Sequence, residues 1–269
     1  MFPLFWLVLA GFTGGILAGL LGIGGGIIYV LVLPYALRDA GLSPEYMPSF
    51  TIANSLFGVL SASLAANYLN IRNHDFYPKE SMWVGIPGAI FSVLILKTIV
   101  IQTWYSITYF YTILILFLAY MFISLFLKKE GRKNKHEHVH RNATLSMAGI
   151  IGGSLAAATG LGGGAAVVPI LNTRLHMNIK KARSVSHAMI WMTALVLTVF
   201  NLLEKTALQN LTYQVGLIYF PVVIPMTIGV LAGSPIGSKL GRKWSSRTIR
   251  ILFGVFILIV IFEKLYQII

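Results

Sequence analysis

Long apolar segments without charge, separated by short charged ones, dominate this chain of 269 residues. Eight long runs contain no Lys, Arg, Asp or Glu: residues 3–37, 46–71, 81–96, 98–127, 143–173, 184–203, 206–238 and 251–262. A helix needs about 20 consecutive apolar residues to cross a bilayer, so these runs predict membrane spans. Composition agrees, because 57% of the residues are hydrophobic and only 11% are charged. The sequence therefore predicts an all-α polytopic membrane protein whose main partner is the lipid bilayer.

Basic residues gather in three of the polar segments. Residues 128–141, 174–183 and 239–250 hold 15 of the 21 Lys and Arg residues. Cytoplasmic loops carry an excess of Lys and Arg, so all three segments are expected on the cytoplasmic side of the cell membrane. The formal net charge of +13 then reflects topology and not nucleic-acid binding. The 38–47 loop is net acidic by one, and it is expected outside together with both termini.

The segment 142–173 has basic flanks on both sides, so it must leave the cytoplasm and return to it. At 1.5 Å per residue, arm 143–159 is about 25 Å long and arm 165–173 about 14 Å, against a hydrocarbon core of about 30 Å. These lengths predict a re-entrant hairpin with its bend at Gly160–Gly164. Another hairpin, the first along the chain, is expected at 3–37. Ordinary spans are expected at 48–69, 81–100, 106–127, 184–203, 213–237 and 251–268.

A glycine cluster occurs twice along the chain. The segment from Gly14 to Gly26 returns as the segment from Gly152 to Gly164, at a constant offset close to half the chain. The expected organisation is a first repeat (1–127), a cytoplasmic linker (128–142) and a second repeat (143–269). Each repeat has a hairpin and three full crossings, which is an odd number, so the second repeat should be inverted. Paired apolar segments interrupted by glycine are a pointer to the binding site of secondary transporters.

The glycine bends are candidates for an anion site built from the main chain. An apolar helix resumes after each triple glycine, and a helix N-terminus presents unpaired N–H groups and the positive end of its dipole. Without Cβ atoms, an anion can approach that backbone closely. The candidate glycines are Gly22, Gly24, Gly25, Gly26, Gly160, Gly162, Gly163 and Gly164. The alternative is that small residues only permit close helix packing, which is expected for Gly15, Gly19, Gly149 and Gly153.

Polar side chains on the helix after each bend extend the candidate substrate site. Asn54 and Ser55 follow the first bend, and Ser186 and His187 follow the second, with Ser55 and Ser186 at corresponding places in the two halves. A serine in a membrane helix often bonds its own i−4 carbonyl, so each serine alone is weak support. An ionisable residue within a span is a functional candidate. Histidine has an unperturbed pKa near 6.5, so His187 could couple a proton to transport. The alternative is a histidine that contacts lipid headgroups.

Residue types that are missing exclude several functions. The chain has no cysteine, and its eight acidic residues lie in loops or at span ends, which argues against Fe–S clusters, cation binding and acid–base hydrolysis in the membrane. Nothing resembles a nucleotide-phosphate loop, so no ATP drive and no cofactor are indicated. A membrane-embedded enzyme is therefore disfavoured. His136, His138 and His140 in the linker are interpreted as a solvated tether, with a metal site as the alternative.

These motifs resemble the TauE/SafE-like family of sulfite exporters. The resemblance rests on the two glycine cores and on the short elements at 51–55 and 182–186, and it covers essentially the whole chain. Departures are Pro34 in place of a proline directly after the first core, and Asn54 and Val185 where the family has threonine. The resemblance implies a secondary transporter that exports sulfite or related sulfur oxoanions and organosulfonates. An anion channel of the same architecture is the alternative.

Overall fold

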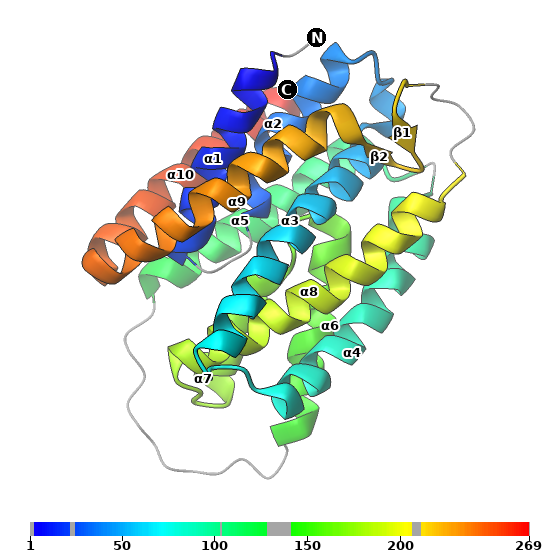
Figure 1. Ribbon diagram of the computed structural model, residues 1–269. Helices are drawn as coiled ribbons and strands as arrows, with labels where there is room; N and C mark the ends of the chain where they lie inside the picture. Colours follow the sequence, from blue (N-terminus) through cyan, green and yellow to red (C-terminus); the bar gives the residue numbers. More distant parts are fainter. Residues whose placement is uncertain (1–2, 22–24, 103, 128–140, 206–210, 269) are drawn as a thin grey trace.

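The computed structural model describes residues 3–21, 25–102, 104–127, 141–205 and 211–268, most of which are helical (Figure 1). The helices are α1 (Leu4–Leu21), α2 (Gly26–Asp39), α3 (Met47–Arg72), α4 (Pro78–Ile95), α5 (Ile107–Leu127), α6 (Arg141–Thr159), α7 (Gly164–Arg174), α8 (Ile179–Leu203), α9 (Phe220–Lys243) and α10 (Ser246–Ile268). A 3₁₀ turn (Pro44–Tyr46) precedes α3, and a π turn (Leu96–Val100) extends α4. Strands β1 (Gln214–Val215) and β2 (Ile218–Tyr219) form a small antiparallel pair before α9.

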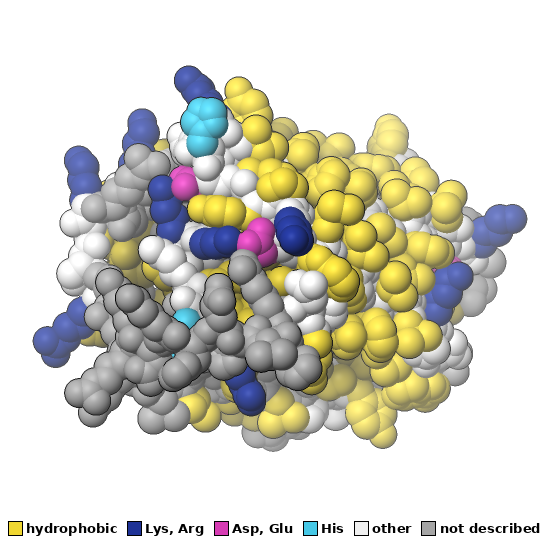
Figure 2. Space-filling view, turned by 90° about the horizontal axis from the view of Figure 1, so that it is seen from below, with side chains coloured by type: hydrophobic (Ala, Val, Ile, Leu, Met, Phe, Trp, Pro, Cys, Tyr) yellow, Lys and Arg dark blue, Asp and Glu magenta, His cyan; other side chains and the backbone are white. Residues whose placement is uncertain are grey.

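Within the described residues, six helices are long and apolar enough to cross a membrane, which confirms the all-α polytopic membrane fold. The six candidate spans are Pro44–Arg72, Pro78–Val100, Ile107–Ser124, Ile179–Leu203, Phe220–Gly237 and Arg247–Ile268. Large apolar side chains point outward from them; Leu116, Ile228 and Phe262 are 66%, 56% and 67% exposed. Seen from the end where α3 passes into α4, Lys and Arg side chains lie near the middle and along the edges of the view, and a wide hydrophobic surface covers one side (Figure 2). That surface is the one expected to face lipid.

Both predicted hairpins are broken helices. Helix α6 ends at Thr159 and α7 begins at Gly164, which confirms the bend expected at Gly160–Gly164. Helix α1 ends at Leu21 and α2 begins at Gly26. With 14 and 11 residues, α2 and α7 are about 21 Å and 17 Å long, too short to cross the bilayer. Each bend therefore turns the chain back inside the protein.

Glycine stripes bring two pairs of helices into close contact, α1 with α9 and α6 with α4. Gly15 of α1 lies against the backbone of Val230, and a Cβ there would be 2.4 Å from the carbonyl oxygen. Gly153 of α6, at the equivalent place in the second repeat, lies against Gly88 in the same way, at 2.0 Å. Gly149 packs on Val84 of α4. The packing role predicted for Gly15, Gly149 and Gly153 is thus confirmed.

The helices of the two halves make equivalent contacts: the most closely packed pairs of helices have counterpart pairs made of the equivalent helices of the other half. Helix α1 packs on α9 as α6 packs on α4, and α3 contacts α9 as α8 contacts α4. Helix α3 packs on its own counterpart α8, and α5 packs on α10. Helices α3 and α8 run in opposite directions (Figure 1). Such an arrangement is typical of a pseudo-two-fold relation between halves.

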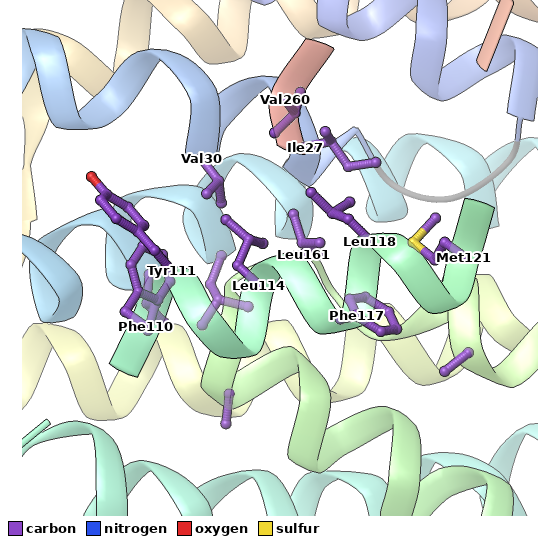
Figure 3. Packing of buried hydrophobic residues seen from close by; sticks show 14 of the residues in the cluster. Ile27, Val30, Phe110, Tyr111, Leu114, Phe117, Leu118, Met121, Leu161 and Val260 are labelled. Atoms are coloured by element: carbon purple, nitrogen blue, oxygen red, sulfur yellow. The ribbon is translucent and has the colours of Figure 1, made fainter. Parts of the chain in front are cut away.

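The largest hydrophobic cluster surrounds the meeting point of the two halves. It joins residues after the first bend (Ile27 and Val30) and within the second (Leu161) to α5 and α10. Figure 3 shows Leu114 and Leu118 of α5 pointing toward these residues. Their burial removes apolar surface from contact with solvent and fixes both bends in the middle of the protein.

One predicted span starts later than expected. The run 213–237 is uncharged throughout, but α9 begins only at Phe220, because residues 214–219 form the β1–β2 pair. The register pairs Gln214 with Tyr219 and Val215 with Ile218. Gly216 has a φ of +56°, which suits the tight turn between the strands. An uncharged hairpin of this length has no signal that separates it from the adjoining apolar helix.

Candidate functional site

Two glycines start the re-entrant helices in the same backbone conformation. Gly25 precedes α2 with φ +70°, and Gly163 precedes α7 with φ +69°. They lie at equivalent places in the two repeats. Gly160 and Gly162 also have positive φ, at +73° and +82°. Residues with a side chain rarely adopt this region, so the bends require glycine.

The two bends meet. A Cβ on Gly26 would lie 2.8 Å from the Cα of Leu161 and 3.0 Å from the carbonyl oxygen of Gly160. This contact joins the start of α2 to the second bend, about half the chain away in sequence. Gly22 and Gly24, which were also predicted to bind, lie outside the described residues. The other six predicted glycines are all buried.

Ser55 joins the bends, and Ser186 lies beside the second. The Ser55 hydroxyl donates to the Gly160 carbonyl oxygen at 2.8 Å and lies 3.4 Å from that of Gly26. The Ser186 hydroxyl lies 3.4 Å from the Gly164 carbonyl oxygen, the repeat equivalent of Gly26. Both serines are fully buried. The structure thus brings both predicted serines to the glycine bends.

Asn54 is buried beside Ser55, but its amide holds the β-hairpin. Its Nδ2 donates to the carbonyl oxygens of Phe50 at 2.7 Å and Leu217 at 3.0 Å, and its Oδ1 accepts from the Tyr219 N–H at 2.9 Å. These bonds connect α3 to the segment before α9. A substrate role for Asn54 stays a prediction, and the geometry gives this side chain a supporting position.

His187 lies next to Ser186, on an adjoining face of α8, and its ring is half-buried. Its Nδ1 is 3.5 Å from Nδ2 of Asn70, and its backbone oxygen accepts a hydrogen bond from Asn67 at 2.9 Å. Both asparagines belong to the later turns of α3. The histidine therefore lies toward the end where α3 passes into α4, and its predicted role in binding remains a prediction.

Sequence reasoning missed an ionic cluster at the other end of the protein. Lys264 of α10 is fully buried, and its Nζ is 3.0 Å from Oε2 of Glu263. The Tyr35 hydroxyl of α2 donates to Glu263 at 2.5 Å, and Lys264 lies over the Tyr111 ring of α5 at 4.8 Å. The signal was the Glu-Lys pair that interrupts the apolar run of the last predicted span.

Metal ligation is not indicated by the described part of the chain. No group of three or more His, Cys, Asp or Glu there could hold a metal ion. The linker histidines His136, His138 and His140 lie outside the described residues, so the metal alternative stays a prediction.

The fold and the paired bends define a polytopic helical membrane protein of the transporter type, and the comparisons place it in a family. The model of the sulfite exporter TauE/SafE family matches residues 4–263. The chain therefore belongs to this family, and it is a membrane transporter.

Curated relatives carry similarly general names. The chain is 27% identical over 256 residues to a probable membrane transporter protein of Methanocaldococcus jannaschii, covering 92% of this chain and 90% of that one. It is 26% identical to a probable membrane transporter protein of Haemophilus influenzae, covering 94% of each. It is 22% identical to the probable membrane transporter protein YunE of Bacillus subtilis, covering 97% of each. No solved structure shows significant similarity to the chain.

Proposed function

We propose that this protein is a secondary carrier of small anions that exports sulfite or a related sulfur oxoanion or organosulfonate across the cell membrane. The observation that carries the proposal is the meeting of the two glycine bends, where Gly26 touches the Gly160–Leu161 backbone. The name of the family, sulfite exporter, supports the sulfur substrate.

The chemistry of the bends favours an anion. Helices α2 and α7 each begin at a glycine bend, and a helix N-terminus offers N–H donors and a partial positive charge. The hydroxyls of Ser55 and Ser186 lie at the same two bends. Both hydroxyls can rotate, so each can donate to a bound oxygen in place of its carbonyl partner. In this proposal the glycines and serines bind the substrate, and Asn54 positions Ser55.

The proposed topology places the second repeat inverted relative to the first. Its support is the equivalent helix contacts of the two halves and the opposite directions of α3 and α8. The basic segments then face the cytoplasm, and both termini lie outside. Inverted repeats with a central site are a known architecture for alternating access.

Coupling to protons is proposed through His187. Histidine changes charge in the physiological range, and a half-buried ring near one end of the path could gain a proton as an anion arrives. The small anionic substrate and the proton would then move together.

The test is flux in proteoliposomes that contain the purified protein. Labelled sulfite, thiosulfate, a taurine-like sulfonate and small carboxylates are compared, with and without a pH gradient. We expect saturable sulfite flux that unlabelled sulfite on the opposite side accelerates. Flux without counterflow would indicate a channel. Sulfur-anion flux no greater than in protein-free liposomes would overturn the proposal.

A further inference from the structure

Three buried side chains at one end of the α3–α8 contact have polar atoms without partners. They are Oγ1 of Thr51, Oγ1 of Thr198, and both amide atoms of Asn201, and no described residue hydrogen-bonds to them. Their side chains are 0%, 4% and 1% exposed. An unpaired buried polar group is costly, and most of all in a protein surrounded by lipid. Such a group indicates a ligand or water.

The β-hairpin covers this end of the two helices. The Leu217 N–H donates to the backbone oxygen of Asn201 at 2.9 Å, and its own carbonyl accepts from Asn54 at 3.0 Å. One residue of the hairpin is thereby bonded to α8 on one side and α3 on the other. Leu217 and Ile218 are buried at 3% and 0% exposure. The hairpin therefore packs over the contact between α3 and α8 at this end.

The repeat places related residues at the opposite end. Thr198 and Asn201 follow Asn67 and Asn70 at the same sequence offset that separates Ser186 from Ser55. Asn67 also has an unpartnered buried Oδ1. Asn70 and His187, however, are half-buried, and among the described residues no hairpin is bonded there. The two ends thus carry equivalent polar residues: Thr198 and Asn201 are both buried, whereas of Asn67 and Asn70 only Asn67 is buried.

We propose that Thr51, Thr198 and Asn201 form an outer station for the transported anion, closed by the 214–219 hairpin. Two of its residues, Thr198 and Asn201, are the repeat equivalents of the inner residues Asn67 and Asn70. This inference rests on the proposed carrier function and deepens it. Threonine hydroxyls and the asparagine NH₂ are uncharged donors, which suit a small oxoanion that must be held and released. The hairpin must separate from Asn54 or Asn201 before an anion passes.

Single-cysteine labelling tests whether the 214–219 hairpin shields the outer station from solvent. The chain has no cysteine of its own, so no native cysteine needs to be replaced first. Thr198→Cys is exposed to the membrane-impermeant sulfonatoethyl methanethiosulfonate, added to the face opposite the linker. We expect slow labelling that becomes at least about tenfold faster when Asn54→Leu removes the bonds to Leu217 and Tyr219. An unchanged rate would show that the hairpin is not a cover. Thr112→Cys, on an exposed face of α5, is the control and should not respond to Asn54→Leu.

The preference of the outer station for anions is tested with the same Thr198→Cys, Asn54→Leu double variant. The sulfonate reagent is compared with the trimethylammonium-ethyl reagent, each rate divided by that for a free thiol. We expect the anionic reagent to react faster after this correction. Equal corrected rates, or faster reaction of the cation, would overturn an anion station, whichever substrate the protein transports.

Contact with substrate is tested by the KM for sulfite in proteoliposomes. Thr198→Val and Asn201→Leu each remove hydrogen-bonding atoms at nearly constant size, so we expect KM to rise roughly threefold to tenfold. Thr198→Ser should restore the wild-type value. The matched control is Thr112→Val, because that hydroxyl bonds its own Thr108 carbonyl at 2.8 Å on an exposed helix face. Unchanged KM in both variants, with normal wild-type flux, would overturn the station and leave the carrier proposal intact. Absent wild-type flux would instead overturn the carrier proposal, and the two labelling tests would still decide the station.

Discussion

At the scale of single residues, the site depends on positions that have no side chain. Gly25 and Gly163 take the same left-handed conformation at equivalent places in the two repeats, and each starts a short helix. Gly26 lets one bend touch the other. The Ser55 hydroxyl contacts both bends, and the Ser186 hydroxyl lies beside the second. In the proposed function, substrate binding therefore depends on backbone shape more than on charged groups.

Replacing Gly25 by valine tests that dependence. A side chain at φ +70° strains the backbone by about 1–3 kcal/mol, and a Cβ would lie 2.9 Å from that of Ala18. We expect Gly25→Val to insert in the membrane but lose sulfite flux, measured in proteoliposomes. The matched control is Gly41→Val, because Gly41 has φ +89° and open space within 4 Å of a Cβ. Normal affinity for substrate in Gly25→Val would leave this glycine a packing role only.

His187 allows a prediction about pH. Glutamine and asparagine keep a hydrogen-bond donor near Asn70 but cannot titrate. We expect His187→Gln and His187→Asn to retain binding and to flatten the pH dependence of transport between about pH 5.5 and 7.5. The measurement is initial flux at a series of pH values. If both variants keep the wild-type profile, the proton belongs to the substrate and not to this residue.

At the scale of elements, two kinds of contact hold the helices. Glycine stripes allow α1 to pack on α9 and α6 on α4 at backbone distance. The cluster around Lys264 joins α2, α5 and α10 by an ion pair, a tyrosine hydroxyl and an aromatic ring. The stripes follow the repeat, whereas the ionic cluster lies at one end of the protein. The cluster ties the far end of the re-entrant helix α2 to two spanning helices.

This cluster predicts unequal effects of single and double substitutions. Lys264→Met leaves Glu263 without its cation in a largely buried place, and we expect a loss of roughly 3 kcal/mol in unfolding free energy. Lys264→Met combined with Glu263→Gln removes both charges and should be more stable than Lys264→Met alone. Denaturation in detergent, followed by circular dichroism, measures both. Additive losses would show that the two charges do not depend on each other.

Much of the fold follows from charge-free runs and from the glycine offset. The six spans and the bend at 160–164 were predictable because lipid requires long apolar helices, and because glycine marks where they break. The β-hairpin was not predictable, since its residues are uncharged like those that begin the helix after it. The partners of Asn54 could not be read either, because Leu217 is far away along the chain and only the packed structure joins them. Glu263 and Lys264 were visible as charges, but not their burial beside Tyr35 and Tyr111.

At the scale of the whole molecule, the two ends of the protein differ, within the described residues, in their charged residues and in whether a hairpin covers the α3–α8 contact. Lys180 and Lys181 at the start of α8 pair with Asp75 and Glu80 at 2.7 Å and 2.6 Å. These ion pairs join the first turn of α8 to the connection between α3 and α4 and to the first turn of α4. The opposite end holds the β-hairpin and the Lys264 cluster. A carrier that closes one end while the other is more open would show this kind of asymmetry.

The topology gives the last prediction, and labelling of single cysteines from each side of the membrane tests it. The ion pairs place Lys79 and Asn178 at one end of the protein, and the basic segments predict the same side for Lys135 and Lys243. We expect cysteines at these four positions to react with an impermeant reagent from the cytoplasmic side only. A cysteine at Gly41, in the acidic loop at the other end, should react only from outside. The same sidedness of positions 135 and 178 would fix the second hairpin as re-entrant. Opposite sidedness of positions 135 and 178 would mean that residues 142–173 cross the membrane, which would exclude the second hairpin and with it the central meeting of two bends on which the anion site is built.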